Sequence, residues 1–207
     1  MDAGAFLVIG IVAFGLLLVV GVLVLAIRSG KRRVQELATA ALTRGWEFAA
    51  TTDEDFAARW PGAPFDIGRI RGYSGVVRAG RVTVFQMHYV ERSFGEDEYW
   101  SYSVCAVPLP APVPAVLVQG RLGVRPEHPP GPAQPSWERR FHVWGDPRAL
   151  TDETRALVSR ELRDGALRTD GDTLLVWQRT RHDVPAVDRL LALGPAVAVT
   201  LAVPPAG

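Results

Sequence analysis

An uncharged apolar run opens the chain, from Ala3 to Ile27, and basic residues follow it at once. Residues 5–27 would form a helix about 35 Å long, which is enough to cross a hydrocarbon core of about 30 Å. Within lipid, only a helix satisfies the backbone hydrogen bonds of a single isolated segment. We therefore predict a transmembrane helix at 5–27, and the rest of the chain must then fold outside the bilayer.

A cleaved signal peptide is the alternative interpretation of this run. It would need a basic first segment, a shorter apolar core and a small-residue cleavage site. The chain begins with Met1-Asp2, has no basic side chain before the run, and the run itself is long. We therefore expect a retained anchor.

The charges beside the run predict its orientation. Four basic residues crowd its C-terminal flank, namely Arg28, Lys31, Arg32 and Arg33. Basic flanks stay in the cytoplasm, so residues 1–4 are predicted to be extracytoplasmic and the following domain cytoplasmic. The same cluster is able to bind anionic lipid, at about 1 kcal/mol per charge, although setting the topology is its simpler role.

Composition limits the remaining 28–207, which suit one domain with its own core. This part carries 23 basic and 21 acidic side chains, without the basic excess of nucleic-acid binders, so no nucleic-acid partner is expected. All but one of the basic residues are Arg and Asn is absent, which is the bias of a high-GC genome. The single cysteine, Cys105, excludes an intramolecular disulfide and agrees with a reducing cytoplasm.

Apolar periodicity predicts an α+β domain over 44–207, with one antiparallel sheet packed by a few helices. Before it, 28–43 is predicted to be a basic juxtamembrane segment and an amphipathic helix, separated from the anchor by a break at Ser29-Gly30. Alternating residues predict an antiparallel meander over 67–107. Its details are a turn at Ala79-Gly80, a loop from Ser93 to Glu98 and a strand end at Pro108.

The second half of the domain is predicted from its turn and capping residues. The expected elements are a short edge strand from Ala115 to Val118, a proline-rich loop at 119–136, a strand from Phe141 to Trp144, a helix capped by Thr151, a hairpin turn at Asp170-Gly171, a helix capped by Asp183, and a final strand or ordered tail within 190–203.

No set of residues identifies a reaction. The histidines His88, His128, His142 and His182 follow no ligand spacing, and one cysteine cannot begin a structural zinc site. We therefore predict no catalytic, cofactor-binding or metal-binding residue, and no cofactor. The six tryptophans are expected to pack the core, with one or two of them lining a groove.

Weaker candidates have simpler explanations. His88 and Glu91 fall on opposite faces of a strand and cannot share a ligand. His142 is interpreted as a partly buried strand residue. The stretch Gly72-Tyr73-Ser74-Gly75 lacks the spacing of a nucleophile elbow. The triplet Glu96-Asp97-Glu98 lacks the spacing of a calcium loop and is interpreted as solvated loop charge.

Several short motifs carry a resemblance to a known group. They are Arg44-Gly45-Trp46, Pro64 to Gly68, the alternating strand through Tyr89, and Arg140 to Val143 leading to Asp146-Pro147. With the anchor, this pattern resembles an uncharacterised family of membrane-anchored proteins of high-GC Gram-positive bacteria, a domain of unknown function. The resemblance covers most of 44–180 and implies no catalytic residue.

Two functions follow as hypotheses. The first is a non-enzymatic, single-pass membrane protein whose domain binds a small ligand, or a protein partner, at the inner membrane face. The second is a membrane-tethered hydrolase or transferase of unrecognised type, which would use dispersed residues such as His88, His142 or Glu91, because catalytic geometry need not be local in sequence.

Overall fold

The computed structural model describes residues 3–93, 96–120, 128–137, 140–162 and 165–201. Its elements are α1 (Ala3–Thr43), β1 (Glu47–Thr52), α2 (Phe56–Arg59), β2 (Arg69–Ala79), β3 (Val82–Ser93), β4 (Glu96–Gly120), β5 (Ala133–Trp137), β6 (Phe141–Gly145), the 3-10 turn η1 (Pro147–Ala149), α3 (Asp152–Glu161), β7 (Gly165–Gln178) and α4 (Val184–Thr200). The predicted α+β class, a large antiparallel sheet with a few helices, is confirmed.

One seven-stranded sheet organises the domain. The strands lie in the order β1-β2-β3-β4-β6-β5, and β7 pairs with β4 outside this path. The pairs are antiparallel throughout. The predicted turn at Ala79-Gly80 joins β2 to β3, and Gly80 there has φ of 59°, a left-handed conformation that favours glycine.

Two apolar clusters cover the two faces of the sheet. The α4-side core joins strand residues such as Val84 and Cys105 to Leu190 and Val197 of α4, and includes Leu37 of α1 and Val158 of α3. The α2-side core packs Phe56 and Trp60 of the α2 region on Phe85, Val104 and Leu175. The meander is therefore buried on both faces, as its sequence predicts.

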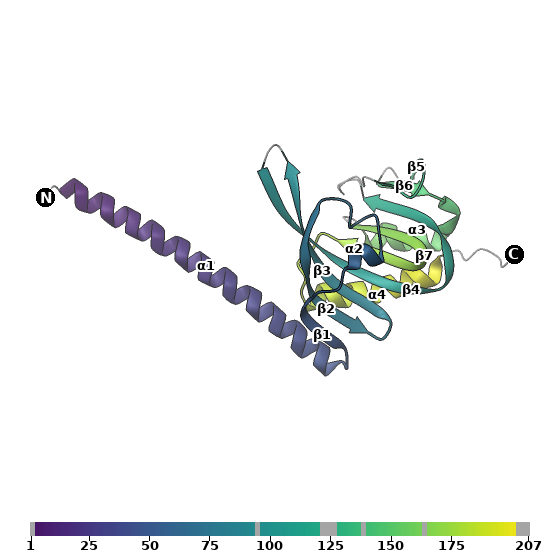
Figure 1. Ribbon diagram of the computed structural model, residues 1–207, viewed down its shortest axis with the longest axis horizontal. Helices are drawn as coiled ribbons and strands as arrows, with labels where there is room; N and C mark the ends of the chain where they lie inside the picture. Colours follow the sequence, from purple (N-terminus) through teal and green to yellow (C-terminus); the bar gives the residue numbers. More distant parts are fainter. Residues whose placement is uncertain (1–2, 94–95, 121–127, 138–139, 163–164, 202–207) are drawn as a thin grey trace.

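Helix α1 is continuous through Ser29-Gly30, so the predicted break there is wrong. Figure 1 shows it projecting from the domain, with its C-terminal end beside β1. Among the described residues, no helix is long and apolar enough to span a membrane. The structure describes the backbone of the predicted span at 5–27 but not all of its side chains, so this span stays a prediction.

Strand β4 runs through Pro108, Pro110, Pro112 and Pro114, where the sequence predicts a strand end and a short edge piece. Its pairing with β3 stops at Ala106, and its pairing with β6 starts at Val116. Among the described residues, the edge of β4 between these two pairings has no partner strand. In a strand, the N–H groups of every second residue point to the same edge, so prolines at alternate positions leave donors missing on one edge only. The unpaired edge therefore tolerates them.

Strand β7 also differs from the prediction, because Asp170-Gly171 is not a hairpin turn. Residues on both sides of it pair with the same long strand, Thr173 with Pro108 and Thr169 with Val116. A register shift in β4 lies opposite, and Gly171 has φ of 60°. The turn-like sequence therefore makes a bulge within one strand.

Two smaller predictions also change. Glu96 to Glu98 lie in β4, where they pair with β3, rather than in a loop. The predicted loop at 119–136 is shorter, since Gln119 and Gly120 end β4 and β5 begins at Ala133; residues 121–127 lie outside the described residues.

The last element is a helix, and the expected strand or tail at 190–203 is wrong. Helix α4 passes through Gly194-Pro195 to Thr200. Leu190, Leu193 and Val197 keep the helical spacing of the buried face.

Candidate functional site

Of the histidines considered in the sequence, His88 and His182 lie close enough for their charges to interact, whereas His142 lies on another strand, β6. His142 is exposed on β6, so its predicted partial burial is wrong; the α2-side core reaches its neighbour Trp144 but does not include His142. His88 and Glu91 lie three residues apart in the regular part of β3, so they are on opposite faces of the strand, as expected. Among the described residues, no group of three or more His, Cys, Asp or Glu side chains is placed to hold a metal ion.

His88 joins two serines across three strands. Its Nε2 lies 2.8 Å from Ser74 Oγ on β2, and its Nδ1 lies 2.9 Å from Ser101 Oγ on β4. Burial lowers the pKa of His88, so the imidazole is neutral near pH 7. The sequence points to neither serine as its partner, because β2 and β4 meet it only through the register of the sheet.

A second histidine, His182, forms a parallel contact that the sequence does not reveal. Its Nε2 donates to the Gly75 carbonyl at 2.8 Å, because a carbonyl only accepts, and its Nδ1 accepts from Ser103 Oγ at 2.9 Å. Burial lowers the pKa of His182. This ring is a hydrogen-bonded part of the core.

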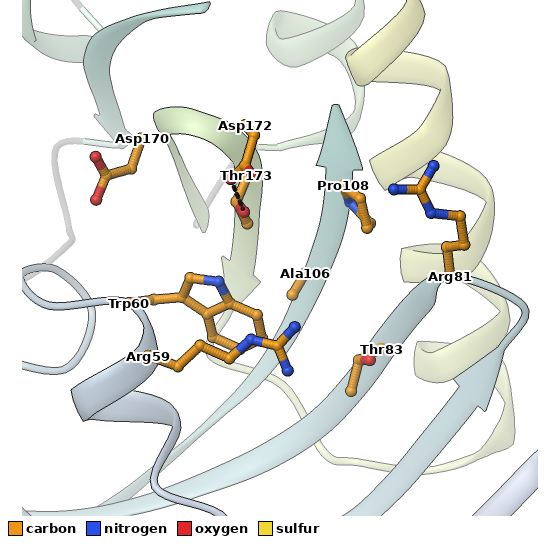
Figure 2. A pocket seen from close by; sticks show the side chains of 9 residues that line it. All are labelled: Arg59, Trp60, Arg81, Thr83, Ala106, Pro108, Asp170, Asp172 and Thr173. Atoms are coloured by element: carbon orange, nitrogen blue, oxygen red, sulfur yellow. Dashed lines mark hydrogen bonds between the residues drawn. The ribbon is translucent and has the colours of Figure 1, made fainter. Parts of the chain in front are cut away.

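A polar pocket of about 630 Å³ lies on the face of the sheet that carries the α2-side core. That volume falls within the range of small-molecule sites, roughly 300–1,000 Å³. Strands β3, β4 and β7 form its floor, α2 forms one wall, and the β7 bulge forms another (Figure 2). The lining residues are Arg59, Trp60, Arg81, Thr83, Ala106, Pro108, Asp170, Asp172 and Thr173.

Cross-strand register builds the floor. Thr83 pairs with Ala106, and Pro108 pairs with Thr173. Thr83 lies two residues before Phe85 on β3, and Phe85 belongs to the α2-side core. Side chains two residues apart point to the same face of a sheet, so the floor lies on the α2-side face. The pocket is thus the polar end of that core, where small and hydroxyl side chains replace large apolar ones.

Aromatic packing builds the α2 wall. Asp55 caps α2, and the helix ends before Pro61-Gly62. Phe56 stacks on Phe85 with ring centroids 4.1 Å apart, and Trp60 stacks on Phe56 at 5.5 Å. The Arg59 guanidinium lies over the Trp60 ring, 4.9 Å from its centroid, and Figure 2 shows it turned toward the strands that carry Ala106 and Thr83.

A buried arginine fixes the opposite wall. Arg168 is only 5% exposed, and it donates to the Ala63 carbonyl at 3.0 Å and to an Asp170 carboxylate oxygen at 2.6 Å. It therefore joins the segment after α2 to the β7 bulge. Gly62 beside it has φ of 95°, a backbone conformation that favours glycine, and a Cβ there would lie 2.5 Å from Arg168 Nη1, so a side chain would also displace the guanidinium.

Charge is distributed unevenly around the pocket. Asp170 is neutralised by Arg168, and Asp172 accepts a hydrogen bond from Thr173 at 3.0 Å. Within the described part of the chain, neither Arg59 nor Arg81 forms a salt bridge. With Arg168 included, guanidinium groups outnumber carboxylates around the pocket.

Sequence reasoning missed this pocket as a site. Trp60 is the groove-lining tryptophan that the composition anticipates, and it is also a core residue. Asp170-Gly171 is noticed in the sequence, but as a turn. The two signals are more than a hundred residues apart, and only the pairing of β7 with β4 brings them together.

The comparisons with known proteins bear on the fold. Neither a protein-family model nor a curated protein matches the chain. Among solved structures, the fold of this chain has a match. It is similar to the crystal structure of the mycobacterial trehalose monomycolate transport factor A, TtfA, with a TM-score of 0.56 and 13% identity over 81% of this chain and 93% of that chain. At this identity the likeness shows the fold alone.

Proposed function

We propose that this protein is a single-pass, membrane-anchored binding module without enzymatic activity, which holds a small polar ligand at the inner membrane face. The observation that carries the proposal is the pocket between α2 and the β7 bulge, with two guanidinium groups outside any salt bridge of the described residues. Small-molecule sites combine a concave pocket with a few well-placed polar groups of this kind.

Exposure along α1 supports the anchor. Eight large apolar side chains there stand free of the domain, namely Leu16, Leu17, Leu18, Val19, Val20, Val22, Val24 and Leu25. Water is an unfavourable environment for such a surface, at about 25 cal/mol per Å². The basic flank follows on the same helix and favours a cytoplasmic domain.

The structural neighbour suggests the process. It is named as a transport factor, and we propose that this chain likewise serves a membrane transport process as an accessory protein. We further propose membership of the membrane-anchored family that its motifs resemble.

Membrane extraction tests the anchor. The full chain should stay in the membrane pellet after an alkaline carbonate wash. Leu17→Arg with Val20→Arg should release it, because each central charge costs about 2.5–3.5 kcal/mol in a spanning helix. Leu42→Arg is the matched control, since Leu42 is 82% exposed on α1 beyond the apolar run. Release of the unaltered chain by carbonate would refute the anchor.

Reporter fusions at Gly207 test the orientation. A fluorescent protein that folds in the cytoplasm should be bright there, and alkaline phosphatase should be inactive. The reverse pattern would place the domain outside.

The second candidate, a tethered hydrolase or transferase, has one observation in its favour. Ser74 Oγ lies 2.8 Å from His88 Nε2, as a nucleophile does from its base. The other ring nitrogen meets the Ser101 hydroxyl and not a carboxylate, so an imidazolium would lack the usual counter-charge. We expect no labelling of Ser74 by a fluorophosphonate; labelling lost in Ser74→Ala would favour the enzyme.

A further inference from the structure

The proposed function leaves the chemistry of the ligand open, and the pocket carries a more specific assignment. We infer that it takes an anionic small molecule that also bears hydroxyl groups, such as a phosphorylated or carboxylated polyol. This inference rests on the proposed binding function and concerns the same site.

The preference for an anion follows from the guanidinium groups. Arg59 and Arg81 line the pocket, and neither forms a salt bridge with another described residue. Stacking over Trp60 holds the Arg59 guanidinium at the wall, so little side-chain freedom is lost when it binds. Guanidinium groups bind phosphate and carboxylate through paired, charge-assisted hydrogen bonds.

A cation is a poor occupant, although two carboxylates line the same pocket. The Asp170 carboxylate is already paired with the buried Arg168. This leaves one lining carboxylate, Asp172, against two lining guanidinium groups, those of Arg59 and Arg81. None of the three forms an ion pair with another described residue. The summed charge therefore favours a negative group near Arg59 and Arg81.

The hydroxyl requirement follows from the floor and the bulge. Thr83 and Thr173 are half-buried and line the pocket with hydroxyl groups. The Thr83 hydroxyl can both donate and accept, whereas the Thr173 hydroxyl donates to Asp172 and is left to accept. Asp172 accepts from Thr173, and its carboxylate has room for further donors. We assign these donors to hydroxyl groups of the ligand, because Arg59 and Arg81 would repel an ammonium group and Asp172 would repel a second anionic group. The ligand is thus bound with its anion toward Arg59 and its hydroxyls toward the bulge.

Calorimetric titration of the full chain in detergent tests this assignment with four probes: glucose 6-phosphate, inorganic phosphate, glucose and spermidine. Glucose 6-phosphate should bind most tightly, inorganic phosphate more weakly, and glucose and spermidine least. Affinity for both anions should fall as salt is added, because the cations are partly exposed.

Variants separate the two halves of the pocket. Arg59→Gln should weaken both anions about tenfold or more, through loss of a charge-assisted hydrogen bond. Thr173→Val should weaken glucose 6-phosphate and leave inorganic phosphate unchanged. Asp172→Asn should weaken glucose 6-phosphate relative to inorganic phosphate, whose own affinity should rise because a repelling charge is lost. Arg179→Gln is the matched control, since Arg179 is also an exposed arginine over a tryptophan, Trp100, but lies outside the pocket.

The outcomes distinguish this inference from the proposed function. Binding of glucose or spermidine that Arg59→Gln does not alter would overturn the anion assignment and leave a ligand-binding module. No binding of either anion up to roughly 10 mM, a range that includes very weak complexes, would also overturn the assignment. The anchor is judged separately by carbonate extraction.

Discussion

Arg44 and Asp188 form a two-point ion pair, with Nη1–Oδ1 and Nη2–Oδ2 distances of 2.6 and 2.9 Å, and this pair joins the end of α1 to the first turns of α4. The same guanidinium lies over Trp46, 4.8 Å from the ring centroid. Leu37 and Ala41 of α1 are buried nearby. The domain is therefore attached to its proposed anchor by packing and charge, and not only by a peptide linker.

The energetic contribution of this ion pair should be small. Both side chains are more than a third exposed, and exposed pairs contribute about 0.2–1 kcal/mol. A double-mutant cycle of Arg44→Ala and Asp188→Ala, measured by denaturant unfolding, should give a coupling energy in this range that shrinks at high salt. A coupling above about 2 kcal/mol would show that the pair is effectively desolvated.

Gly194 should be intolerant of a side chain. A Cβ there would lie 2.8 Å from Val107 Cγ2 and 2.9 Å from Cys105 Sγ, both buried on β4. Gly194→Ala should destabilise the domain by about 1 kcal/mol or more, because overpacking exceeds the gain in helix propensity. Gly30→Ala, which meets nothing within 4 Å on α1, should instead be neutral or stabilising by up to about 1 kcal/mol. Equal effects on the melting temperature would contradict this packing argument.

Arg168 should be structurally important. Arg168→Met keeps the aliphatic stem but leaves the Ala63 carbonyl and Asp170 without their donor. We expect a loss of about 2–3 kcal/mol in the free energy of unfolding. Arg160→Met is the control, because Arg160 is exposed and pairs with its neighbour Glu161, and it should change stability by less than about 0.5 kcal/mol. A similar small loss in Arg168→Met would mean that water replaces the guanidinium.

Stability should fall as the pH drops below about 6.5. Burial lowers the pKa of both His88 and His182 in the folded protein, so near pH 6 the unfolded chain binds more protons than the folded one. The free energy of unfolding therefore decreases on acidification, by up to about 1.4 kcal/mol per pH unit for each histidine.

Unfolding between pH 7.5 and 5.5 measures this effect. His182→Gln should flatten the pH dependence, whatever its effect on stability at pH 7.5. His142→Gln, at an exposed position on β6, is the matched control. An unchanged slope in His182→Gln would assign the pH dependence to other groups.

Burial also makes the single cysteine chemically inert. It raises the pKa of Cys105 to about 12, so the reactive thiolate is scarce. A maleimide should label Cys105 only as the domain unfolds. Rapid labelling of the native chain would show that α4 opens away from β4.

Local patterns predicted much of the fold, because some elements are determined by residues close in sequence. Thr151 and Asp183 begin α3 and α4 as expected, since each side chain accepts from a backbone N–H of the first turn. The turn at Gly80 and the two-faced burial of β3 followed from glycine and from alternation. These interactions form within a few residues and are visible in any window of the sequence.

Where prediction failed, a distant partner overrode a local preference. Gly194-Pro195 marks a helix end in isolation, yet α4 continues because Leu193 and Val197 are buried and the Thr151 and Thr154 hydroxyls donate to the Thr200 carbonyl. Asp170-Gly171 marks a hairpin, yet β4 is long enough to pair with residues on both sides of it.

The sequence by itself determined the apolar run with its basic flank, the α+β class, and the helix starts, since each depends on composition or on neighbouring residues. Only the tertiary structure decided the pocket. Arg59 and Asp172 face the same space because β7 pairs with β4 and because Arg168 joins the bulge to the segment after α2. Pairing across a sheet depends on register between remote segments, and no local pattern in the sequence specifies that register.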